Sequence, residues 1–362
     1  MMPRFTFSGL PTRVVFGSRT IGSIGSEVER LDRRRAFVVC SAAQQREGEM
    51  VCDLLGRSCS DVYAGAVLHT PTSVTKDAMH AMVGAVSDCI VSIGGGSAIG
   101  LGKALALRTG IPQICVPTTY AGSEMTPILG QTEDAEKTTL ADPAILPKTV
   151  IYDVELTKSL PKRLAAASGL NAIAHAAEAL YAQNGNPIIG LLAQEGIAAL
   201  IRSLPQIVSD PIADQSRSDA LYGAWLCGVC LGSVGMALHH KLCHVVAGSF
   251  DLPHAETHAI LLPYALAYNL EATPTALEAL RTATGSNDPA RKIYDLSRAL
   301  DLPVSLGELG FGEDNIDRAT TLTMKNSYWN PRPFDHSSIR EILRAACGGR
   351  PPKTVRVDDY RI

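Results

Sequence analysis

The chain has 362 residues, of which 46% are hydrophobic and 19% are charged, and its formal net charge is −3. A chain of this length and composition can form two domains, each with its own hydrophobic core. The nearly balanced charge offers no general attraction to nucleic acid or to an anionic membrane surface. We therefore look for a partner among small molecules, and expect no nucleic acid and no membrane.

The cysteines and the apolar segments indicate the compartment. Nine scattered cysteines favour a reducing cytoplasm over a disulfide framework. The N-terminal residues MMPRFTFSGLPTRVVF lack the apolar run of a signal peptide. Residues 221–238 are apolar enough for a membrane span, but they are rich in small residues and lead into a histidine cluster, which predicts a buried helix. Within them, Cys227 and Cys230 have ordinary core spacing.

The first part of the chain alternates between strand and helix patterns. Short apolar runs rich in β-branched residues, bounded by charges or glycine, predict buried parallel strands. We expect strands at residues 12–17, 36–40, 62–67, 89–93, 114–116 and 150–152. We expect helices at residues 21–31, 46–57, 75–86 and 98–107, and an irregular hairpin or loop at 132–148. This alternation predicts a doubly wound, Rossmann-like parallel sheet.

A glycine-rich turn follows the strand predicted at residues 89–93. Gly94, Gly95, Gly96 and Ser97 separate this strand from a helix, so backbone amides can approach a phosphate at the helix N-terminus. The turn differs from the G-x-G-x-x-G fingerprint because its sixth position is Ile99. The next strand ends in a run of hydroxyl-bearing and small residues, at the edge of the sheet where ligands bind. The residues concerned are Thr118, Thr119, Tyr120 and Ser123.

From about residue 157 the strand signal disappears and long apolar-periodic segments follow. We expect helices at residues 161–182, 187–203, 215–239, 257–270, 272–283, 289–299, 313–324 and 336–347. The sequence therefore predicts an α/β domain at residues 1–156 and an all-helical domain at residues 157–362.

Histidines concentrate in the second part: residues 239–258 hold five of the nine. His240 and His244 lie one helical turn apart, and His254 and His258 repeat that spacing after a break. Upstream, Asn171 and His175 also lie four residues apart. Clustered neutral imidazoles bind a divalent metal, pass protons or hold an anionic substrate.

Together these residues resemble the iron-containing alcohol dehydrogenase family over nearly the whole chain. The likeness rests on GGGS, PTT, GLNAIAHAAEA and the pattern H-x3-H-x9-H that starts at His240 and is followed by AILLPY. It implies a dehydroquinate synthase-like fold with an NAD(P)-binding α/β domain, a helical domain, an active site between them, and a homodimer. Within the family, LPTRVVFG, GGGSAIGLGKALAL and PTTYAGSE resemble the maleylacetate reductases, which reduce an enone dicarboxylate in aromatic-ring catabolism.

The resemblance also implies roles for individual residues. His175, His240 and His254 match the metal ligands of the metal-dependent members, and His244 matches a histidine near the nicotinamide. The positions that match the cofactor side of the cleft are Gly94, Gly95, Gly96, Ser97, Thr118, Thr119 and Ser123.

Several positions depart from the metal-dependent members. Asn171 stands where they have Asp, so a dication would face three neutral imidazoles and no anion. Gly100 replaces a second Asp, and His258 replaces what is usually Asn. Maleylacetate reductases also lack the first Asp and work without a metal, so we expect no metal here. Ser41 stands where many members have an Asp that binds the adenosine ribose, so either NADH or NADPH can serve.

The resulting hypothesis is a metal-independent reduction of the double bond of maleylacetate by NADH or NADPH. The catalytic candidates are His244, His254, His175, His240 and Tyr120. The candidates for binding the dicarboxylate substrate are Lys241, Asn171 and His258, with Arg332 a further partner. Three alternatives remain open: a metal-dependent alcohol dehydrogenase that uses Asn171 as a ligand, a lyase similar to dehydroquinate synthase, and a non-enzymatic metal- or nucleotide-binding protein.

Overall fold

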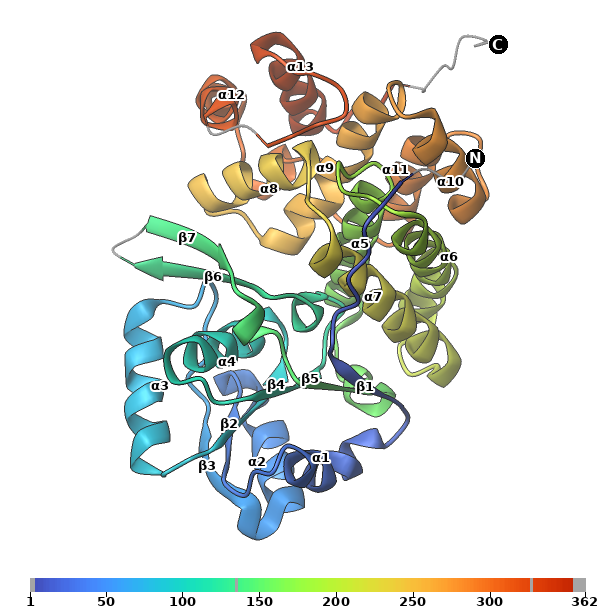
Figure 1. The fold of residues 1–362 in the computed structure, drawn as a ribbon. Coiled ribbons are helices and arrows are strands. Elements are labelled where there is room, and N and C mark those ends of the chain that lie inside the picture. Colours follow the sequence, from blue (N-terminus) through green and yellow to red (C-terminus); the bar gives the residue numbers. More distant parts are fainter. Residues whose placement is uncertain (1–3, 134–135, 326–327, 354–362) are drawn as a thin grey trace. The chain divides into compact units, whose positions relative to one another are not determined.

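The computed structural model describes residues 4–133, 136–325 and 328–353 (Figure 1). It divides into two compact units, one formed by Gly9–Leu160 and the other by Met1–Ser8 with Pro161–Ile362. The first is an α/β unit and the second is helical, which confirms the predicted fold class. The two units are described separately.

The α/β unit contains a six-stranded sheet in the order β1-β8-β5-β4-β2-β3, with all pairs parallel. The strands are β1 Arg13–Gly17, β2 Ala36–Val39, β3 Cys59–Tyr63, β4 Cys89–Gly94, β5 Gln113–Pro117 and β8 Thr149–Asp153. The strand predicted at residues 62–67 is wrong, because β3 begins at Cys59 and ends at Tyr63. Because β3 is an edge strand, it can carry polar residues, and residues 59–61 therefore do not form the apolar run by which the other strands were predicted.

Helices cover both faces of this sheet. They are α1 Ile24–Arg30 and α2 Gln45–Leu55 on one face, and α3 Thr72–Gly84 and α4 Gly96–Thr109 on the other. Successive strand residues point to opposite faces, so Val38 and Val91 pack with α1 and α2, whereas Phe37 and Ile90 pack with α3 and α4. Burial on both faces explains the continuous apolar runs in the sequence.

A separate hairpin pairs β6 Ile128–Glu133 with β7 Glu136–Ala141. The hairpin or loop predicted at residues 132–148 therefore begins too late, although a hairpin is present. Short 3-10 helices occupy Thr20–Ser23, Ala42–Gln44, Gly56–Ser58, Ser123–Met125, Pro143–Ile145, Val154–Thr157, Gly307–Leu309 and Glu313–Asn315.

One cysteine pair departs from the expectation of free thiols. Cys52 near the end of α2 and Cys59 at the start of β3 form a disulfide that closes a short connection. The other seven cysteines are free and buried. Cys227 and Cys230 are among these, in agreement with their interpretation as core residues.

The second unit consists of helices. They are α5 Lys162–Ala179, α6 Pro187–Ser209, α7 Asp214–Ser233, α8 Leu238–Ser249, α9 His254–Leu270, α10 Pro274–Thr284, α11 Pro289–Ala299, α12 Ile316–Met324 and α13 His336–Cys347. Helix α5 is buried along residues 165–179 and packs against α6, α7 and α9. It is therefore the central helix of the unit.

The long helix predicted at residues 215–239 is wrong, because the chain bends by 98° between α7 and α8. The extended backbone of Val234 ends α7, and α8 then starts as an independent helix. This break also divides the membrane-span candidate at residues 221–238. Helix α6 is long and apolar enough to span a membrane, but it packs against α5 and α7 within the helical unit.

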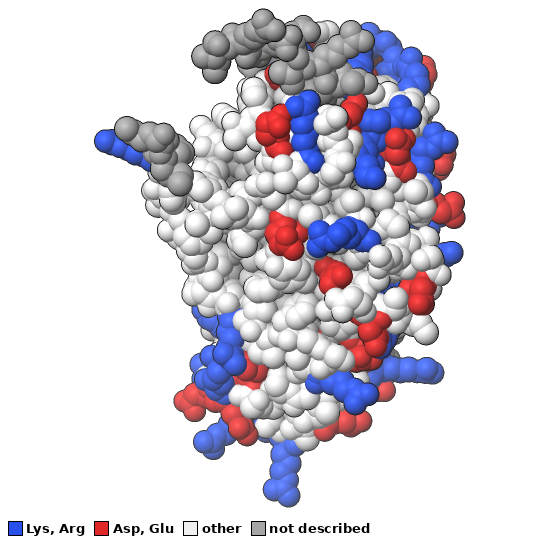
Figure 2. Space-filling view, turned by 90° about the vertical axis from the view of Figure 1, so that its right-hand side faces the viewer, with Lys and Arg blue, Asp and Glu red and all other residues white. Residues whose placement is uncertain are grey.

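Charged side chains of both signs are interspersed on the face shown in Figure 2, without a large area of one sign. This pattern agrees with the net charge of −3. The face gives no electrostatic reason to expect a polyanionic partner.

Candidate active site

The glycine turn joins the end of β4 to the start of α4. Gly94 has φ +140°, and a Cβ at this position would lie 2.4 Å from Gln44 Oε1. A Cβ on Gly95 would lie 3.0 Å from the Thr119 side chain. The positive φ at Gly94 therefore favours glycine strongly, and a side chain at either position would crowd its neighbour. Gly96 begins the fourteen-residue helix α4, whose first amides are suited to hold a phosphate.

Ser41 follows β2, and Thr118 follows β5. Gln44 connects them, because its Nε2 donates to Thr118 Oγ1 at 2.7 Å and its Oε1 accepts from Ser41 Oγ at 3.3 Å. The Thr118 amide also donates to the carbonyl of Gly94 at 3.1 Å. Since the strand order reverses between β2 and β4, these residues lie at the edge where doubly wound sheets bind nucleotides.

The segment after Thr118 is held by a buried lysine. Lys103 Nζ donates to Ser123 O at 2.6 Å, Ile128 O at 2.9 Å, Thr126 Oγ1 at 3.0 Å and Ser123 Oγ at 3.4 Å. Burial lowers the pKa of Lys103 to about 8. Tyr120 is fully buried in this same unit. Sequence reasoning missed both Gln44 and Lys103, since Thr118 and the segment 123–128, which they contact, lie far from them in the chain.

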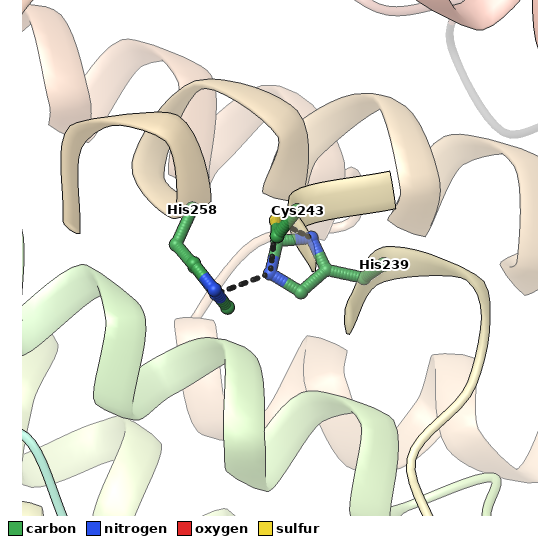
Figure 3. Close-up of side chains that lie close together, drawn as sticks. All are labelled: His239, Cys243 and His258. Atoms are coloured by element: carbon green, nitrogen blue, oxygen red, sulfur yellow. Dashed lines mark hydrogen bonds between the residues drawn. The ribbon is translucent and has the colours of Figure 1, made fainter. Parts of the chain in front are cut away.

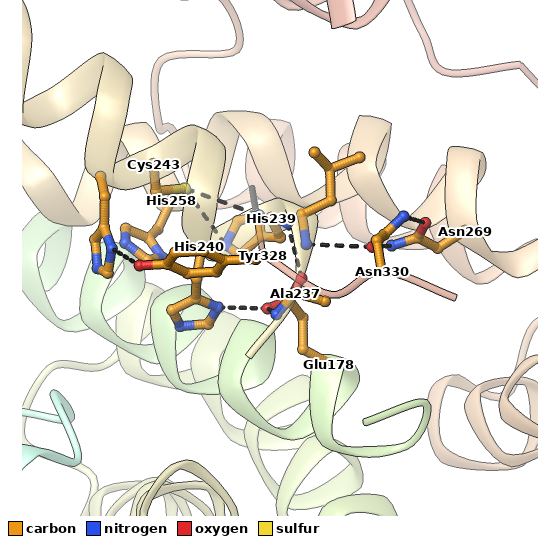
Figure 4. A network of polar contacts seen from close by, with 11 residues as sticks. Glu178, Ala237, His239, His240, Cys243, His258, Asn269, Tyr328 and Asn330 are labelled. Atoms are coloured by element: carbon orange, nitrogen blue, oxygen red, sulfur yellow. Dashed lines mark hydrogen bonds and ion pairs between the residues drawn. The ribbon is translucent and has the colours of Figure 1, made fainter. Parts of the chain in front are cut away.

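The histidine cluster forms within the helical unit, where α5, α8 and α9 bring its members together (Figure 4). His175 comes from α5, and its ring centroid lies 5.1 Å from that of His240. The His258 ring lies 5.2 Å from that of His240 and 4.4 Å from that of His254. His244 lies 6.2 Å from His240. The structure therefore brings together all the histidines selected from the sequence.

Glu178, which sequence reasoning missed, orders this cluster (Figure 4). Its Oε2 accepts from the Ala237 amide at 2.7 Å and pairs with His240 Nδ1 at 2.8 Å. Its Oε1 accepts from the His239 amide at 2.7 Å. A carboxylate from α5 thus caps the N-terminus of α8, where the helix dipole favours negative charge. The available sequence signal was one acid within an otherwise apolar helical run, three residues after His175.

The cluster contains buried polar atoms with no hydrogen-bond partner among the described residues. They are Asn171 Oδ1, His175 Nδ1, His240 Nε2 and His258 Nε2. Leaving such an atom unpaired costs about 1–3 kcal/mol, so four in one region indicate a place for a polar ligand. Burial also lowers the pKa values of His175, His239 and His258 well below the ordinary histidine value, with help from neighbouring histidines. These three rings are therefore neutral at pH 7.

The exposed side of the cluster contains His244, Lys241 and Tyr328. His244 Nδ1 lies 3.2 Å from Tyr328 Oη, and Lys241 Nζ lies 5.3 Å from the centre of the Tyr328 ring. Partial burial lowers the pKa of Lys241. The sequence did not single out Tyr328. Arg332 is bound to the Glu271 carboxylate and the Tyr268 carbonyl, so its proposed role as a substrate partner is not favoured.

Two family models match the chain. The model described as iron-containing alcohol dehydrogenase covers residues 11–154, and the one described as the C-terminal part of the Fe-containing alcohol dehydrogenase family covers residues 165–347. The chain belongs to the iron-containing alcohol dehydrogenase family. It is therefore an oxidoreductase of a family that uses NAD(P).

Several relatives of this oxidoreductase match over their full length. The maleylacetate reductase of Rhizobium sp. strain MTP-10005 is 49% identical over 97% of this chain and 100% of its own. Maleylacetate reductase 1 of Rhodococcus opacus is 46% identical over 96% of this chain and 98% of its own. The crystal structure of maleylacetate reductase from Agrobacterium tumefaciens has a TM-score of 0.94 at 49% identity, covering 97% of this chain and 100% of its own.

Proposed function

We propose that this chain is a maleylacetate reductase, which reduces the carbon–carbon double bond of maleylacetate to give 3-oxoadipate without a metal. The observation that carries the proposal is the full-length identity of 49% to a maleylacetate reductase. The chemistry of the histidine cluster supports the same substrate class. Lys241, at the margin of this cluster, can form a charge-assisted hydrogen bond with a carboxylate of such a substrate.

The cofactor side of the proposal lies in the α/β unit, Gly9–Leu160. Gly94, Gly95, Gly96 and Ser97 would hold the pyrophosphate through backbone amides. The remaining cofactor candidates are Thr118, Thr119, Ser123 and Ser41. When bound, the reduced nicotinamide supplies a hydride to the double-bond carbon beta to the ketone. Because Ser41 carries no charge, either NADH or NADPH fits this proposal.

Negative charge then develops on the ketone oxygen, and residues of the helical unit have to stabilise it. His175, His244 and His254 are the donor candidates, with Tyr120 a weaker one. His240 has a different role, because its Nδ1 faces the Glu178 carboxylate, which can only accept. Nδ1 therefore carries a hydrogen and donates to Glu178, which leaves Nε2 as the ring atom available to the substrate. Asn171 and His258 offer further unpaired atoms to the substrate.

The donor set fits the iron of the family poorly. The ligand positions hold the neutral amide of Asn171 with His175, His240 and His254, so the set supplies no negative charge of its own to a dication. The Glu178 carboxylate beside His240 already accepts from two backbone amides and His240. We therefore derive no catalytic step through a metal.

The deciding experiment is NADH oxidation with maleylacetate by chelator-treated enzyme, with and without added Fe²⁺ or Zn²⁺. Full activity without metal is the expected result. Activity that appears only with metal would favour the alternative, a metal-dependent alcohol dehydrogenase in which Asn171 is a ligand. No oxidation under either condition would refute the substrate assignment.

The donor assignment has its own test. Replacing His244 or His254 by alanine is expected to lower turnover by about 10²–10³-fold, the usual cost of losing one such donor. His336, an exposed histidine at the start of α13, is the matched control. Unchanged turnover in both variants would contradict the assignment.

The proposal also places the enzyme in the cytoplasm as a homodimer. The predominance of free cysteines supports the compartment, and light scattering of the purified protein would measure the assembly. A monomeric mass at micromolar concentration would contradict the dimer.

A further inference from the structure

Three side chains converge in the core of the helical unit beside the histidine cluster (Figure 3). His239 and Cys243 lie one turn apart on α8, and His258 comes from α9. None is more than 1% exposed. Cys243 also packs in the apolar cluster formed with α12 and α13, so it is fixed in place.

The potential ligand atoms of these residues are spaced as a metal site requires. His239 Nε2 lies 3.1 Å from His258 Nδ1, and Cys243 Sγ lies 3.5 Å from His239 Nε2. All three atoms lie within 4.8 Å of one another. Metal bonds of about 2.05 Å to nitrogen and about 2.3 Å to sulfur place the ligand atoms of a trigonal site about 3.5–3.8 Å apart. The two closest pairs are within about 0.5 Å of that spacing.

We propose that His239, Cys243 and His258 form a binding site for a thiophilic d10 cation, with Cu⁺ as the best match. The site is distinct from Asn171, His175, His240 and His254, which match the family's metal ligands and include no sulfur. Two imidazoles and one thiolate are a ligand set that copper sites use with trigonal geometry. The site goes beyond the proposed reductase function and does not depend on it.

Charge balance favours Cu⁺ over a dication. On binding, the Cys243 thiol loses its proton to solvent. The hydrogen shared between His239 Nε2 and His258 Nδ1 moves to the second nitrogen of the ring that carried it. Cu⁺ with one thiolate and two neutral imidazoles has no net charge, whereas Zn²⁺ leaves one uncompensated positive charge on the site. A fully buried site disfavours net charge.

The site also has a consequence for the neighbouring cluster. The His258 ring lies 4.4 Å from that of His254 and 5.2 Å from that of His240. A metal bound through Nδ1 would replace the hydrogen bond from His239 and fix the orientation of the His258 ring. Because the same ring offers its Nε2 to the histidine cluster, copper binding is expected to inhibit the enzyme.

The test is an anaerobic titration of the purified chain with Cu⁺ supplied from a competing chelator, followed by X-ray absorption of the bound copper. We expect one tight site per chain with sulfur and nitrogen in the first coordination shell. Cys243→Ser is expected to weaken copper binding by about 100-fold or more. Replacing even a residue that only contacts a metal ligand lowers metal affinity by about 10–100-fold. Cys227→Ser, which alters another buried cysteine in the same unit, is the matched control.

Each other outcome overturns the proposal. Loss of binding in Cys227→Ser would identify the Cys227/Cys230 pair as the copper ligands. Unchanged affinity in Cys243→Ser, or a coordination shell without sulfur, would identify the imidazoles of the histidine cluster. No tight binding would mean that the three side chains serve packing alone. If Cys243→Ser does not fold, as monitored by circular dichroism, His258→Gln and the coordination shell of the unmodified chain still decide the question.

Discussion

Lys103 in the α/β unit and the histidine cluster in the helical unit differ in how their buried polar atoms are paired. In the α/β unit, Lys103 is fully buried, and its amine contacts four oxygen acceptors of the segment 123–128. In the helical unit, four buried atoms of the histidine cluster have no hydrogen-bond partner among the described residues. The first arrangement is an internal cross-link that needs nothing further. The unpaired atoms of the histidine cluster cost free energy until a ligand forms hydrogen bonds with them. This difference indicates that Lys103 belongs to the structural scaffold and that the histidine cluster belongs to the reactive site.

Glu178 is the exception that most sharply tests this comparison, because it is a fully paired group within the unsatisfied cluster. In Glu178→Ala, the amides of Ala237 and His239 and the Nδ1 of His240 lose their acceptor. We expect the free energy of unfolding to fall by about 3–5 kcal/mol, as for other broken buried pairs. Denaturant unfolding of this variant measures the loss.

Glu278→Ala provides the control, since Glu278 forms an exposed pair with Arg281 on α10. Its removal should change the free energy of unfolding by less than about 1 kcal/mol. Equal effects of the two substitutions would mean that Glu178 does not cap α8 as the structure indicates.

Lys103→Met tests the cross-link in the α/β unit. It keeps most of the side-chain volume but leaves the acceptors Ser123 O, Thr126 Oγ1 and Ile128 O without the ammonium group. We expect unfolding free energy to fall by about 1–3 kcal/mol at pH 7, since burial of the charge offsets part of the gain from its hydrogen bonds. Thermal unfolding beside Arg108→Met, which alters a less buried cation on the same helix, measures the difference. A stabilised variant would refute the cross-link.

A comparison of the unmodified chain with Lys103→Met also gives a pH-dependent prediction. Lys103 has a folded-state pKa of about 8, below its unfolded value of about 10.4, so between these values the unfolded chain binds more protons. The unfolding free energy of the unmodified chain should therefore rise with pH across this window relative to Lys103→Met, by at most about 1.4 kcal/mol per pH unit.

The charged or titratable groups that influence Lys103 are Cys115 and Glu124, both fully buried or nearly so. Unfolding measured at pH 7.5, 8.5 and 9.5 (about the range set by these pKa values) tests the slope. A difference that shrinks with rising pH would have the wrong sign and would contradict the depressed pKa.

Tyr328→Phe is expected to have the smallest effect. It removes the hydroxyl beside His244 Nδ1 at a partly exposed position, where one hydrogen bond contributes about 0.5–1 kcal/mol. Turnover with maleylacetate should fall by about 2–5-fold, and the free energy of unfolding should fall by no more than about 1 kcal/mol. Steady-state kinetics give the first quantity. If turnover instead falls as far as is expected for His244→Ala, the Tyr328 hydroxyl contacts the substrate directly.

Local patterns in the sequence determined the fold class and most of the elements. Apolar runs predicted β2 and β4 because a strand covered on both faces leaves a continuous signal, and helical periodicity predicted α11 and α13 within a residue of their bounds. The edge strand β3 was misplaced, since only one of its sides pairs with the sheet. Five of the selected histidines were found because they lie within twenty residues of one another.

Only the tertiary structure decided which atoms meet and which are left unpaired. The break between α7 and α8 depends on a carboxylate 59 residues upstream of Ala237, and no local propensity records such a cap. Gln44 joins the ends of β2 and β5 across 74 residues. Cys243 is a candidate metal ligand only because the packing of α9 places His258 beside His239. Sequence spacing selects residues that share a helix face, whereas hydrogen-bond partners and ligand sets depend on distances between elements, which only packing fixes.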